Sequence, residues 1–543
     1  MGNNLAGKRR LVFLTVNCSY SHSSLALPLL HCASCDLPWE WLRYDMTTGE
    51  DIMRAVRSIY AFDCDLVAAN LYLFNRQTAL EVLQRFHALA PQCRIVVGGP
   101  ECLGEGGAEL LRQYPWLDCV FRGEGEMIFR EYLEQFDDGS HLPGRIMPSE
   151  GSGVYESWSS SPYPVDDPFF VTDKPFVQME SSRGCPLGCF YCTSGGTAPR
   201  YRTLEQVREE LAKLAAKGVR EIRMLDRTFN LPRSRGVQLL RLFREEFPEI
   251  RFHLELHPQF LDDELKQELE KALPGQLHIE AGIQCLDQRV QDLSGRRSNV
   301  TAALEGLAFL CRCTAFETHA DLLAGLPGQT WEHILNDTAS LMKIRTAEIQ
   351  LEVLKILWGT PLCDIAPGYG VKYNPAAPYD VMMSDTMSLD ERRYARDLSR
   401  LLDMTYNHKV LHPVVCLMNE ECPEFVGKFL EFFHNSQGDS TALWDLKKRF
   451  LFLFDFCREH HLEQSAVEVA WQWLMAGFPP GQGPDVYSEK ITDLPVDLQL
   501  LQGNDECRNS RETRFWQFPR QEGIRYLAFN RAYALNLPAA VWS

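Results

Sequence analysis

The stretch Met179–Gly196 reads MESSRGCPLGCFYCTSGG, and three and then two residues separate its cysteines, Cys185, Cys189 and Cys192. A short, largely apolar run, Phe176–Ser181, leads into this stretch, and we predict it to be a β-strand. Glycine and proline between the cysteines favour a loop, in which three thiolates can reach three corners of an iron–sulfur cube. Such a cube keeps one iron open for another molecule. The alternatives are a chance grouping and a zinc site with a distant fourth ligand.

Strand and helix patterns alternate around this stretch, over residues 176–370. The helix after the first strand is the clearest, because its leucines and valine form one stripe. The expected strands are Phe176–Ser181, Glu221–Leu225, Phe252–Leu256, Leu277–Ile283, Thr318–Ala324 and Ile349–Ile356. Six strand–helix units predict a partial, TIM-like (β/α)6 barrel, in which the chemistry lies at the carboxyl ends of the strands.

Residues 8–140 show a similar alternation and predict a second α/β domain. Its expected strands are Arg10–Asn17, Trp39–Asp45, Asp65–Leu71, Arg94–Gly98 and Leu117–Arg122. Short apolar runs without strict alternation are typical of parallel strands that are buried on both faces. We therefore expect a doubly wound, Rossmann-like sheet, whose ligand lies beyond the carboxyl ends of its strands. The glycine-rich phrases Gly98–Pro100 and Gly123–Glu126 follow the fourth and fifth strands at that edge.

The remaining segments differ in composition. Residues 141–175 are predicted to be a linker, since Ser159–Pro168 reads SSSPYPVDDP. Residues 371–543 lose the alternation and are predicted to form a mainly α-helical domain. Its expected helices are Leu389–Tyr406, Phe425–His434, Thr441–His460 and Leu462–Gly477.

Length and charge exclude some classes of protein. With 543 residues the chain exceeds what one hydrophobic core supports, so several domains are expected. The formal net charge of −18 argues against general binding to nucleic acid. No apolar stretch has the length of a membrane span, and we expect a cytoplasmic protein. Most of the 18 cysteines lie singly in apolar runs, which is typical of reduced, buried thiols.

The cysteine spacing resembles the CxxxCxxC pattern of the radical S-adenosylmethionine (SAM) superfamily. The phrases VVGGPE at Val96–Glu101 and FRGEGE at Phe121–Glu126 look like the cobalamin-binding domain that precedes many such enzymes. The chain thus resembles cobalamin-binding radical SAM proteins. Further phrases resemble a largely uncharacterised bacterial subgroup with a C-terminal helical domain: SSRGCP at Ser181–Pro186, LDRTFN at Leu225–Asn230 and DLLAGLPGQT at Asp321–Thr330.

The resemblance implies that the three cysteines hold a catalytic 4Fe-4S cluster and that SAM chelates its open iron. It also implies SAM contacts: Tyr191 and Gly325 at the adenine, Asp226 at the amino group, Glu280 and Gln284 at the ribose, and Arg296 at the carboxylate. Relatives often carry a GGE-like phrase where this chain has Asp226, so that contact departs from the pattern. The alternatives are surface pairing for Arg296 and a structural ion pair for Glu280.

For cobalamin, the resemblance implies a second set of residues: Tyr72 in the loop Leu71–Asn75 below the corrin ring, Gly98, Gly99 and Pro100 along the nucleotide tail, and Gly123 and Glu124. The DxHxxG phrase that supplies an axial histidine in mutase-type domains is absent. We therefore expect cobalamin whose own base is displaced and whose cobalt has no histidine ligand. The alternative is an α/β module that has lost cobalamin.

The implied activity is reductive cleavage of SAM to a 5′-deoxyadenosyl radical, followed by cobalamin-dependent methylation of an unactivated carbon. The alternatives are another cobalamin-assisted radical conversion, such as cyclisation or rearrangement, and a non-catalytic cobalamin- or cluster-binding protein. We expect a small-molecule or peptide substrate and an electron donor such as flavodoxin or ferredoxin. No phrase in the C-terminal helices identifies the substrate.

Overall fold

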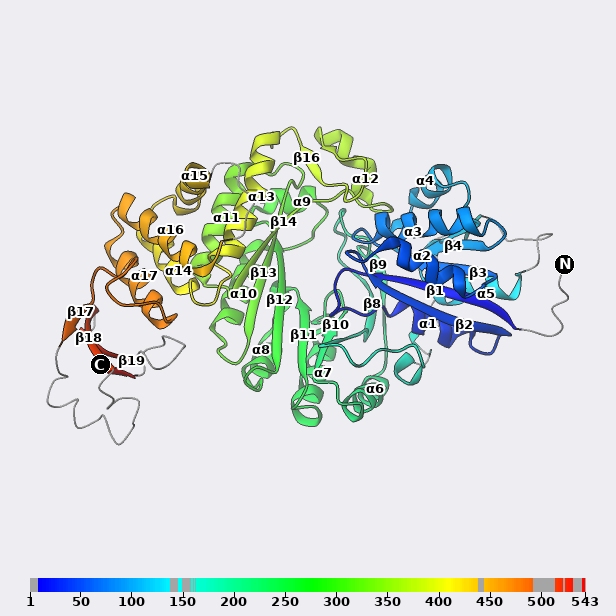
Figure 1. The fold of residues 1–543 in the computed structure, drawn as a ribbon, viewed down its shortest axis with the longest axis horizontal. Coiled ribbons are helices and arrows are strands. Elements are labelled where there is room, and N and C mark those ends of the chain that lie inside the picture. The colour runs from blue at the N-terminus through cyan, green and yellow to red at the C-terminus, as the bar shows by residue number, and fades with distance from the viewer. Residues whose placement is uncertain are drawn as a thin grey trace. The chain divides into compact units, whose positions relative to one another are not determined.

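The computed structural model describes residues 8–136, 145–148, 158–159, 161, 163–437, 444–491, 513–520, 523–530 and 540–542 (Figure 1). Contacts divide the chain into two compact units. The first comprises residues 1–318, 323–330 and 353–392, and the second comprises residues 319–322, 331–352 and 393–543. Of the predicted linker, residues 141–144, 149–157, 160 and 162 lie outside the described residues. The predicted domain bounds stay a prediction.

The N-terminal part of the first unit contains a six-stranded sheet in the order β2-β1-β3-β4-β5-β6. The strands are β1 (Arg9–Asn17), β2 (Trp39–Thr47), β3 (Leu66–Asn70), β4 (Arg94–Gly98), β5 (Cys119–Phe121) and β6 (Ile146–Met147). Neighbouring strands pair in parallel. The helices between them are α1 (Ala26–Ser34), α2 (Ile52–Ala61), α3 (Arg76–Leu89), α4 (Gly106–Gln113) and α5 (Gly125–Glu134).

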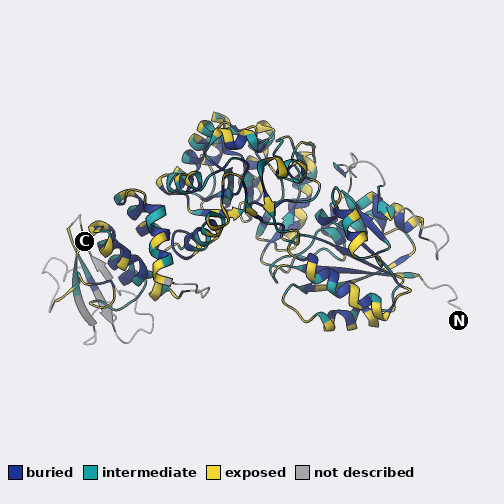
Figure 2. Cartoon of the chain, turned by 90° about the horizontal axis from the view of Figure 1, so that it is seen from above, coloured by how far each residue is buried: buried dark blue, intermediate teal, exposed yellow. Residues whose placement is uncertain are grey.

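Both faces of this sheet are covered, which confirms the doubly wound fold. Val12 and Leu14 of β1 pack with the α2 and α3 side, whereas Leu11 and Phe13 pack with the α1 and α5 side. Alternate residues of a strand point to opposite faces, so a strand buried on both sides is apolar throughout. In Figure 2 the strands are largely buried, while the flanking helices carry both buried and exposed residues.

The second parallel sheet runs in the order β14-β13-β12-β11-β10-β7. Its strands are β7 (Val177–Met179), β10 (Glu221–Met224), β11 (Arg251–Leu256), β12 (Leu277–Gln284), β13 (Glu317–Ala324) and β14 (Glu348–Val353). The helices are α6 (Leu204–Ala216), α7 (Arg233–Glu246), α8 (Asp263–Glu270), α9 (Gln288–Leu293), α10 (Val300–Arg312) and α11 (Trp331–Ile344). Six strands that follow one another along the sheet confirm the partial barrel.

A short hairpin that the sequence analysis did not predict carries the cysteine loop. It pairs β8 (Ser182–Cys185) with β9 (Thr197–Tyr201) in antiparallel orientation. Gly184 has a φ of +89°, and a Cβ atom there would lie 2.7 Å from the carbonyl oxygen of Ala198. Only glycine accepts this conformation without strain. The hairpin therefore holds the cysteines just beyond the end of β7.

A short segment follows the barrel in the first unit and includes α12 (Pro361–Ile365), β15 (Lys372–Tyr373) and β16 (Val381–Met383). The helices beyond it are α13 (Leu389–Met404), α14 (His412–Glu421), α15 (Phe425–Gln437), α16 (Leu446–Glu459) and α17 (Glu463–Met475). Aromatic rings such as Phe429 and Phe456, 5.1 Å apart, form the core of these helices. This agrees with the predicted helical domain, although residues 441–443 of one predicted helix lie outside the described residues.

Beyond α17 the described residues form an antiparallel sheet, an element that the sequence analysis did not predict within the mainly α-helical domain. Its strands are β17 (Glu489–Ile491), β18 (Thr513–Arg520), β19 (Gly523–Asn530) and β20 (Ala540–Trp542). β18 and β19 each contain aromatic residues and pair in antiparallel orientation on either side of a short connection, which is typical of a hairpin. Among the described helices, none combines the length and the apolar character that crossing a membrane requires.

Candidate functional site

The three cysteines lie on a tightly wound loop. The amide of Gly195 donates to the carbonyl of Cys192 at 3.1 Å, and the amide of Cys192 donates to the carbonyl of Cys189 at 3.3 Å. A Cβ atom at Gly195 would lie 2.6 Å from the carbonyl oxygen of Cys189, so a side chain does not fit there. Cys185 and Cys189 are buried free thiols, and Cys192 is a half-buried one. Three thiols gathered on one glycine-rich loop fit the donor set of a 4Fe-4S cluster with an open iron.

The turn after β10 holds the start of this loop. Asp226 is buried, and its carboxylate accepts hydrogen bonds from the Ser181 amide at 2.9 Å, the Ser181 hydroxyl at 2.5 Å and the Ser182 hydroxyl at 2.6 Å. The Thr228 hydroxyl lies 3.4 Å from the sulfur of Cys185. Burial raises the pKa of Asp226, and the bonds from Ser181 and Ser182 oppose that rise. Asp226 thus fixes the approach to Cys185, and its contact with SAM stays a prediction.

Arg296 lies on the loop after α9 and points at the cysteine loop. Its Nη1 is 3.7 Å from the sulfur of Cys189 and 3.5 Å from the hydroxyl oxygen of Tyr191, and its Nη2 donates to the carbonyl of Gly282 at 2.5 Å. Arg296 is only 7% exposed, which excludes the alternative of surface pairing. Its Nε is buried and has no hydrogen-bond partner among the described residues. A buried, partly unsatisfied guanidinium fits an anionic ligand such as the carboxylate of SAM.

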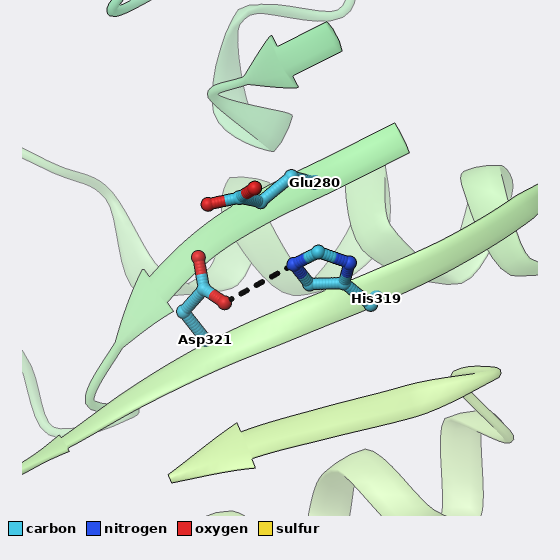
Figure 3. A group of neighbouring side chains, drawn as sticks. All are labelled: Glu280, His319 and Asp321. Carbon is cyan, nitrogen blue, oxygen red and sulfur yellow. Dashed lines mark ion pairs between the residues drawn. The ribbon is translucent and has the colours of Figure 1, made fainter. Parts of the chain in front are cut away.

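Glu280, another predicted residue, lies on β12, and Figure 3 draws it together with His319 and Asp321 of β13. Glu280 on β12 forms an ion pair with Nε2 of His253 at 2.9 Å, as the structural alternative predicts. On β13, Nε2 of His319 lies 3.4 Å from the carboxylate of Asp321. Gln284 ends β12 with a φ of +70°, an uncommon value for a residue other than glycine. Whether Glu280 and Gln284 contact the ribose stays a prediction.

The predicted adenine loop is also ordered by local contacts. Gly325 has a φ of +100°, and its amide donates to Oε1 of Gln329 at 2.8 Å. The same oxygen accepts from the amide of Leu326 at 3.1 Å, so one glutamine side chain closes the turn after β13. Tyr191 is held by Arg296, and burial raises the pKa of its hydroxyl above the ordinary value.

A cavity of 940 Å³ lies at the carboxyl ends of the strands of the first sheet. Its wall includes the six residues predicted to contact cobalamin: Tyr72, Gly98, Gly99, Pro100, Gly123 and Glu124. The cavity is also lined by Cys192 and by residues 193–195 of the cysteine loop. Because β1 lies between β2 and β3, the connections that follow β1 and β3 lead toward opposite edges of the sheet. Folds of this kind bind ligands at such a switch point, beyond the carboxyl ends of the strands.

Gly99 shows how closely the backbone approaches itself at this wall. Its φ is +104°, and a Cβ atom there would lie 2.7 Å from the carbonyl oxygen of Leu71. The amide of Leu71 donates to the carbonyl of Gly98 at 2.7 Å, so the loop after β3 and the loop after β4 form one surface. A smooth, glycine-lined surface of this kind fits a large planar ligand with an extended tail.

Ion pairs tie this wall to the hairpin that carries the cysteines. Arg183 of β8 donates to Glu126 at 2.7 Å and to Glu180 at 2.8 Å, and Arg200 of β9 donates to Glu124 at 2.9 Å. Burial raises the pKa of Glu180, and the neighbouring Arg183 opposes that rise. The sequence analysis missed Arg183 and Arg200. Glu124, which it assigned to cobalamin, is held by the guanidinium of Arg200.

Known proteins resemble this chain most clearly over the region that contains the cysteine loop and the second parallel sheet. Residues 179–340 match the Radical SAM superfamily. The chain carries a radical SAM domain. Residues 367–473 match a family described as "Protein of unknown function (DUF4080)". An uncharacterized methyltransferase of Pyrococcus horikoshii is 24% identical over 311 residues, which are 53% of this chain and 65% of that protein. The chain spans 29% and 36% of two further methyltransferases, so it covers less than two thirds of these relatives.

Two solved structures share the fold. The radical SAM methyltransferase TsrM of Kitasatospora setae, with cobalamin and a [4Fe-4S] cluster bound, has 20% identity and a TM-score of 0.53, over 68% of this chain and 78% of that one. The cobalamin-dependent radical SAM enzyme OxsB, with aqua-cobalamin and SAM bound, has 15% identity and a TM-score of 0.54, over 86% and 79%. The groups bound there are those that the resemblance implies. The match over residues 179–340 confirms the resemblance to radical SAM enzymes, and the two solved structures show that the chain shares their fold.

Proposed function

We propose that the chain is a cobalamin-dependent radical SAM methyltransferase that binds a 4Fe-4S cluster through Cys185, Cys189 and Cys192. One observation carries the proposal: a single cavity is lined both by the glycine-rich loops of the first sheet and by Cys192. In this arrangement two cofactors and a substrate carbon can meet in one enclosed space, as transfer of a group between them requires. The names of the three curated relatives reported above, each a methyltransferase, support methyl transfer over cyclisation or rearrangement.

When bound, the reduced cluster and cobalamin supply one electron for the cleavage of SAM and a methyl group, respectively. The protein's own residues bind, orient and enclose these groups. Asp226, through Ser181 and Ser182, orients the strand end that carries Cys185. Arg296 offers an unsatisfied Nε to the SAM carboxylate, and Tyr191 and Gly325 border the adenine. Gly98, Gly99 and Gly123 let the corrin and its nucleotide tail approach the backbone.

The substrate class and the electron donor belong to the same proposal. We infer a small molecule or a peptide as the substrate, because the formal net charge of −18 argues against a nucleic-acid substrate. The electron donor is a flavodoxin or a ferredoxin, since cleavage of a sulfonium needs a one-electron carrier of low potential.

The experiment is anaerobic reconstitution with iron, sulfide and hydroxocobalamin, followed by reduction in the presence of SAM. Absorbance spectra and iron content report the two cofactors, and mass spectrometry detects 5′-deoxyadenosine. The wild-type protein should bind both cofactors and release 5′-deoxyadenosine. C189A should lose the cluster and the cleavage of SAM but keep cobalamin, because Cys189 does not line the cobalamin cavity.

Cys311 supplies the matched control, since it is a partly buried free thiol on α10 outside the cysteine loop. C311A should retain both cofactors and the wild-type rate of SAM cleavage. Cleavage at an equal rate in C189A would contradict the cluster assignment. SAM with an isotope-labelled methyl group tests the second half of the proposal: label should appear on reduced cobalamin, and its absence would favour a radical conversion without methyl transfer.

A further inference from the structure

Arg296 carries a positive charge into a buried position beside a cysteine of the proposed cluster. Its Nη1 lies 3.7 Å from the sulfur of Cys189, and the residue is 7% exposed. Its other described hydrogen-bond partners are the hydroxyl of Tyr191 and the carbonyl of Gly282. None of these three partners is a carboxylate. The charge of the guanidinium is therefore not neutralised by a direct ion pair at the cysteine loop.

The position of Arg296 is fixed by the packing of two loops. The amide of Phe190 donates to the carbonyl of Ser294 at 2.9 Å, which joins the cysteine loop to the loop after α9. A Cβ atom at Gly295 would lie 2.5 Å from the ring of Phe190. The amide of Arg296 donates to the carbonyl of Gln291 at 2.9 Å. The guanidinium thus reaches Cys189 from a backbone that neighbouring residues hold in place.

We propose that Arg296 raises the reduction potential of the iron–sulfur cluster by donating a charge-assisted hydrogen bond to the ligand sulfur of Cys189. This inference rests on the proposed function, because it presupposes the cluster. Adding an electron makes the cluster and its thiolates more negative, so a buried cation next to a ligand sulfur stabilises the reduced state more than the oxidised one. Hydrogen bonds to the ligand sulfurs are among the features that tune such clusters.

This role differs from binding of the SAM carboxylate, and the two are separable. Binding of SAM can use the unsatisfied Nε, whereas the contact with Cys189 uses Nη1. A role in SAM binding alone predicts a potential that does not depend on Arg296 when SAM is left out. A role in tuning predicts a change of potential in SAM-free protein.

The test is a redox titration of the anaerobically reconstituted, SAM-free protein, with the reduced cluster measured by electron paramagnetic resonance. R296Q removes the charge and most donors. It should lower the ratio of reduced to oxidised cluster about tenfold at a fixed potential, which corresponds to about 59 mV for one electron. Arg297 is the adjacent and exposed arginine, so R297Q makes the same change in net charge as a control. R297Q should titrate like the wild type.

Equal potentials for R296Q and the wild type, at equal iron content, would overturn the inference and leave the proposed function intact. Wild-type protein that takes up no cluster would instead overturn the proposed function. Should R296Q take up no cluster, R296M replaces it in the titration, because methionine keeps a long side chain but lacks both the charge and the N–H donors. A lower potential in R296M supports the inference, and an unchanged one overturns it.

Discussion

Replacing Gly99 by alanine tests whether the wall of the cavity depends on the close approach of its two loops. Gly99 has a φ of +104° and a ψ of −176°, a conformation that is almost confined to glycine and costs other residues about 1–3 kcal/mol. The new Cβ atom would lie 2.7 Å from the carbonyl oxygen of Leu71 and 3.1 Å from its nitrogen. Overpacking of this kind adds about 1–3 kcal/mol, and the lower entropy of the unfolded alanine chain offsets about 0.4–1 kcal/mol. G99A should therefore destabilise the first unit by about 1–6 kcal/mol.

Gly98 provides the matched control, since a Cβ atom there would lie no closer than 3.4 Å to its neighbours, of which the nearest is Cβ of Phe121. Both variants are compared with the wild type by urea unfolding of the full chain, which circular dichroism monitors. With a dependence of about 1–3 kcal/mol per molar urea, G99A should lower the unfolding midpoint of the first unit by about 0.3 M or more. G98A should stay close to the wild type. Equal midpoints for G98A and G99A would refute the reasoning.

Two further changes probe buried polar groups. The hydroxyl of Tyr379 donates to Glu101 at 2.8 Å, and both residues are buried. Y379F should therefore destabilise the protein by about 1.5–3 kcal/mol and lower its thermal unfolding midpoint. An unchanged midpoint would contradict this prediction. Burial lowers the pKa of His257 from 6.5 to about 3, so the folded state binds fewer protons than the unfolded chain, and stability is lost as the pH falls below about 6.5. Between about pH 6 and pH 5, H257Q should lose about 1.4 kcal/mol less unfolding free energy per pH unit than the wild type. Urea unfolding at each pH measures this free energy. Wild-type and variant free energies that fall in parallel with pH would argue against the assignment to His257.

Most parallel strands of both sheets were predictable, because each is a short apolar run that is recognisable from its own residues. The exception is β6, a two-residue strand within the segment predicted to be a linker. Arg94–Gly98 was predicted with the bounds that β4 has. The β8–β9 hairpin was not predictable in this way. Gly184 interrupts it at a positive φ, the register shifts between Arg183 and Cys185, and its second strand comes only after the cysteine loop. Such pairing depends on how the loop folds back, which one sequence does not encode locally.

Within the candidate site, residues with a local motif were predictable and residues that act through distant partners were not. The cysteines are recognisable by their spacing, and Gly98 and Gly123 by their place after apolar runs. Arg183 contacts Glu126 across 57 positions of the sequence, and Arg200 contacts Glu124 across 76. Neither arginine stands in a sequence pattern that distinguishes it from other charged residues. The carboxylate with which each one pairs is therefore known only from the folded structure.

These ion pairs explain why the loop after β5 carries two carboxylates where a ligand surface alone would favour uncharged groups. The side chains of Arg183, Arg200, Glu124 and Glu126 are each less than 20% exposed, so their pairing is poorly screened and leaving one unpaired would be costly. Charge-assisted bonds from both strands of the hairpin restrict sliding and tilting of the cysteine loop against the glycine-rich wall. The protein's own side chains therefore set the spacing between the two proposed cofactor sites before either cofactor binds. Because the two sites are already fixed relative to each other, little entropy is lost when the bound reacting groups meet.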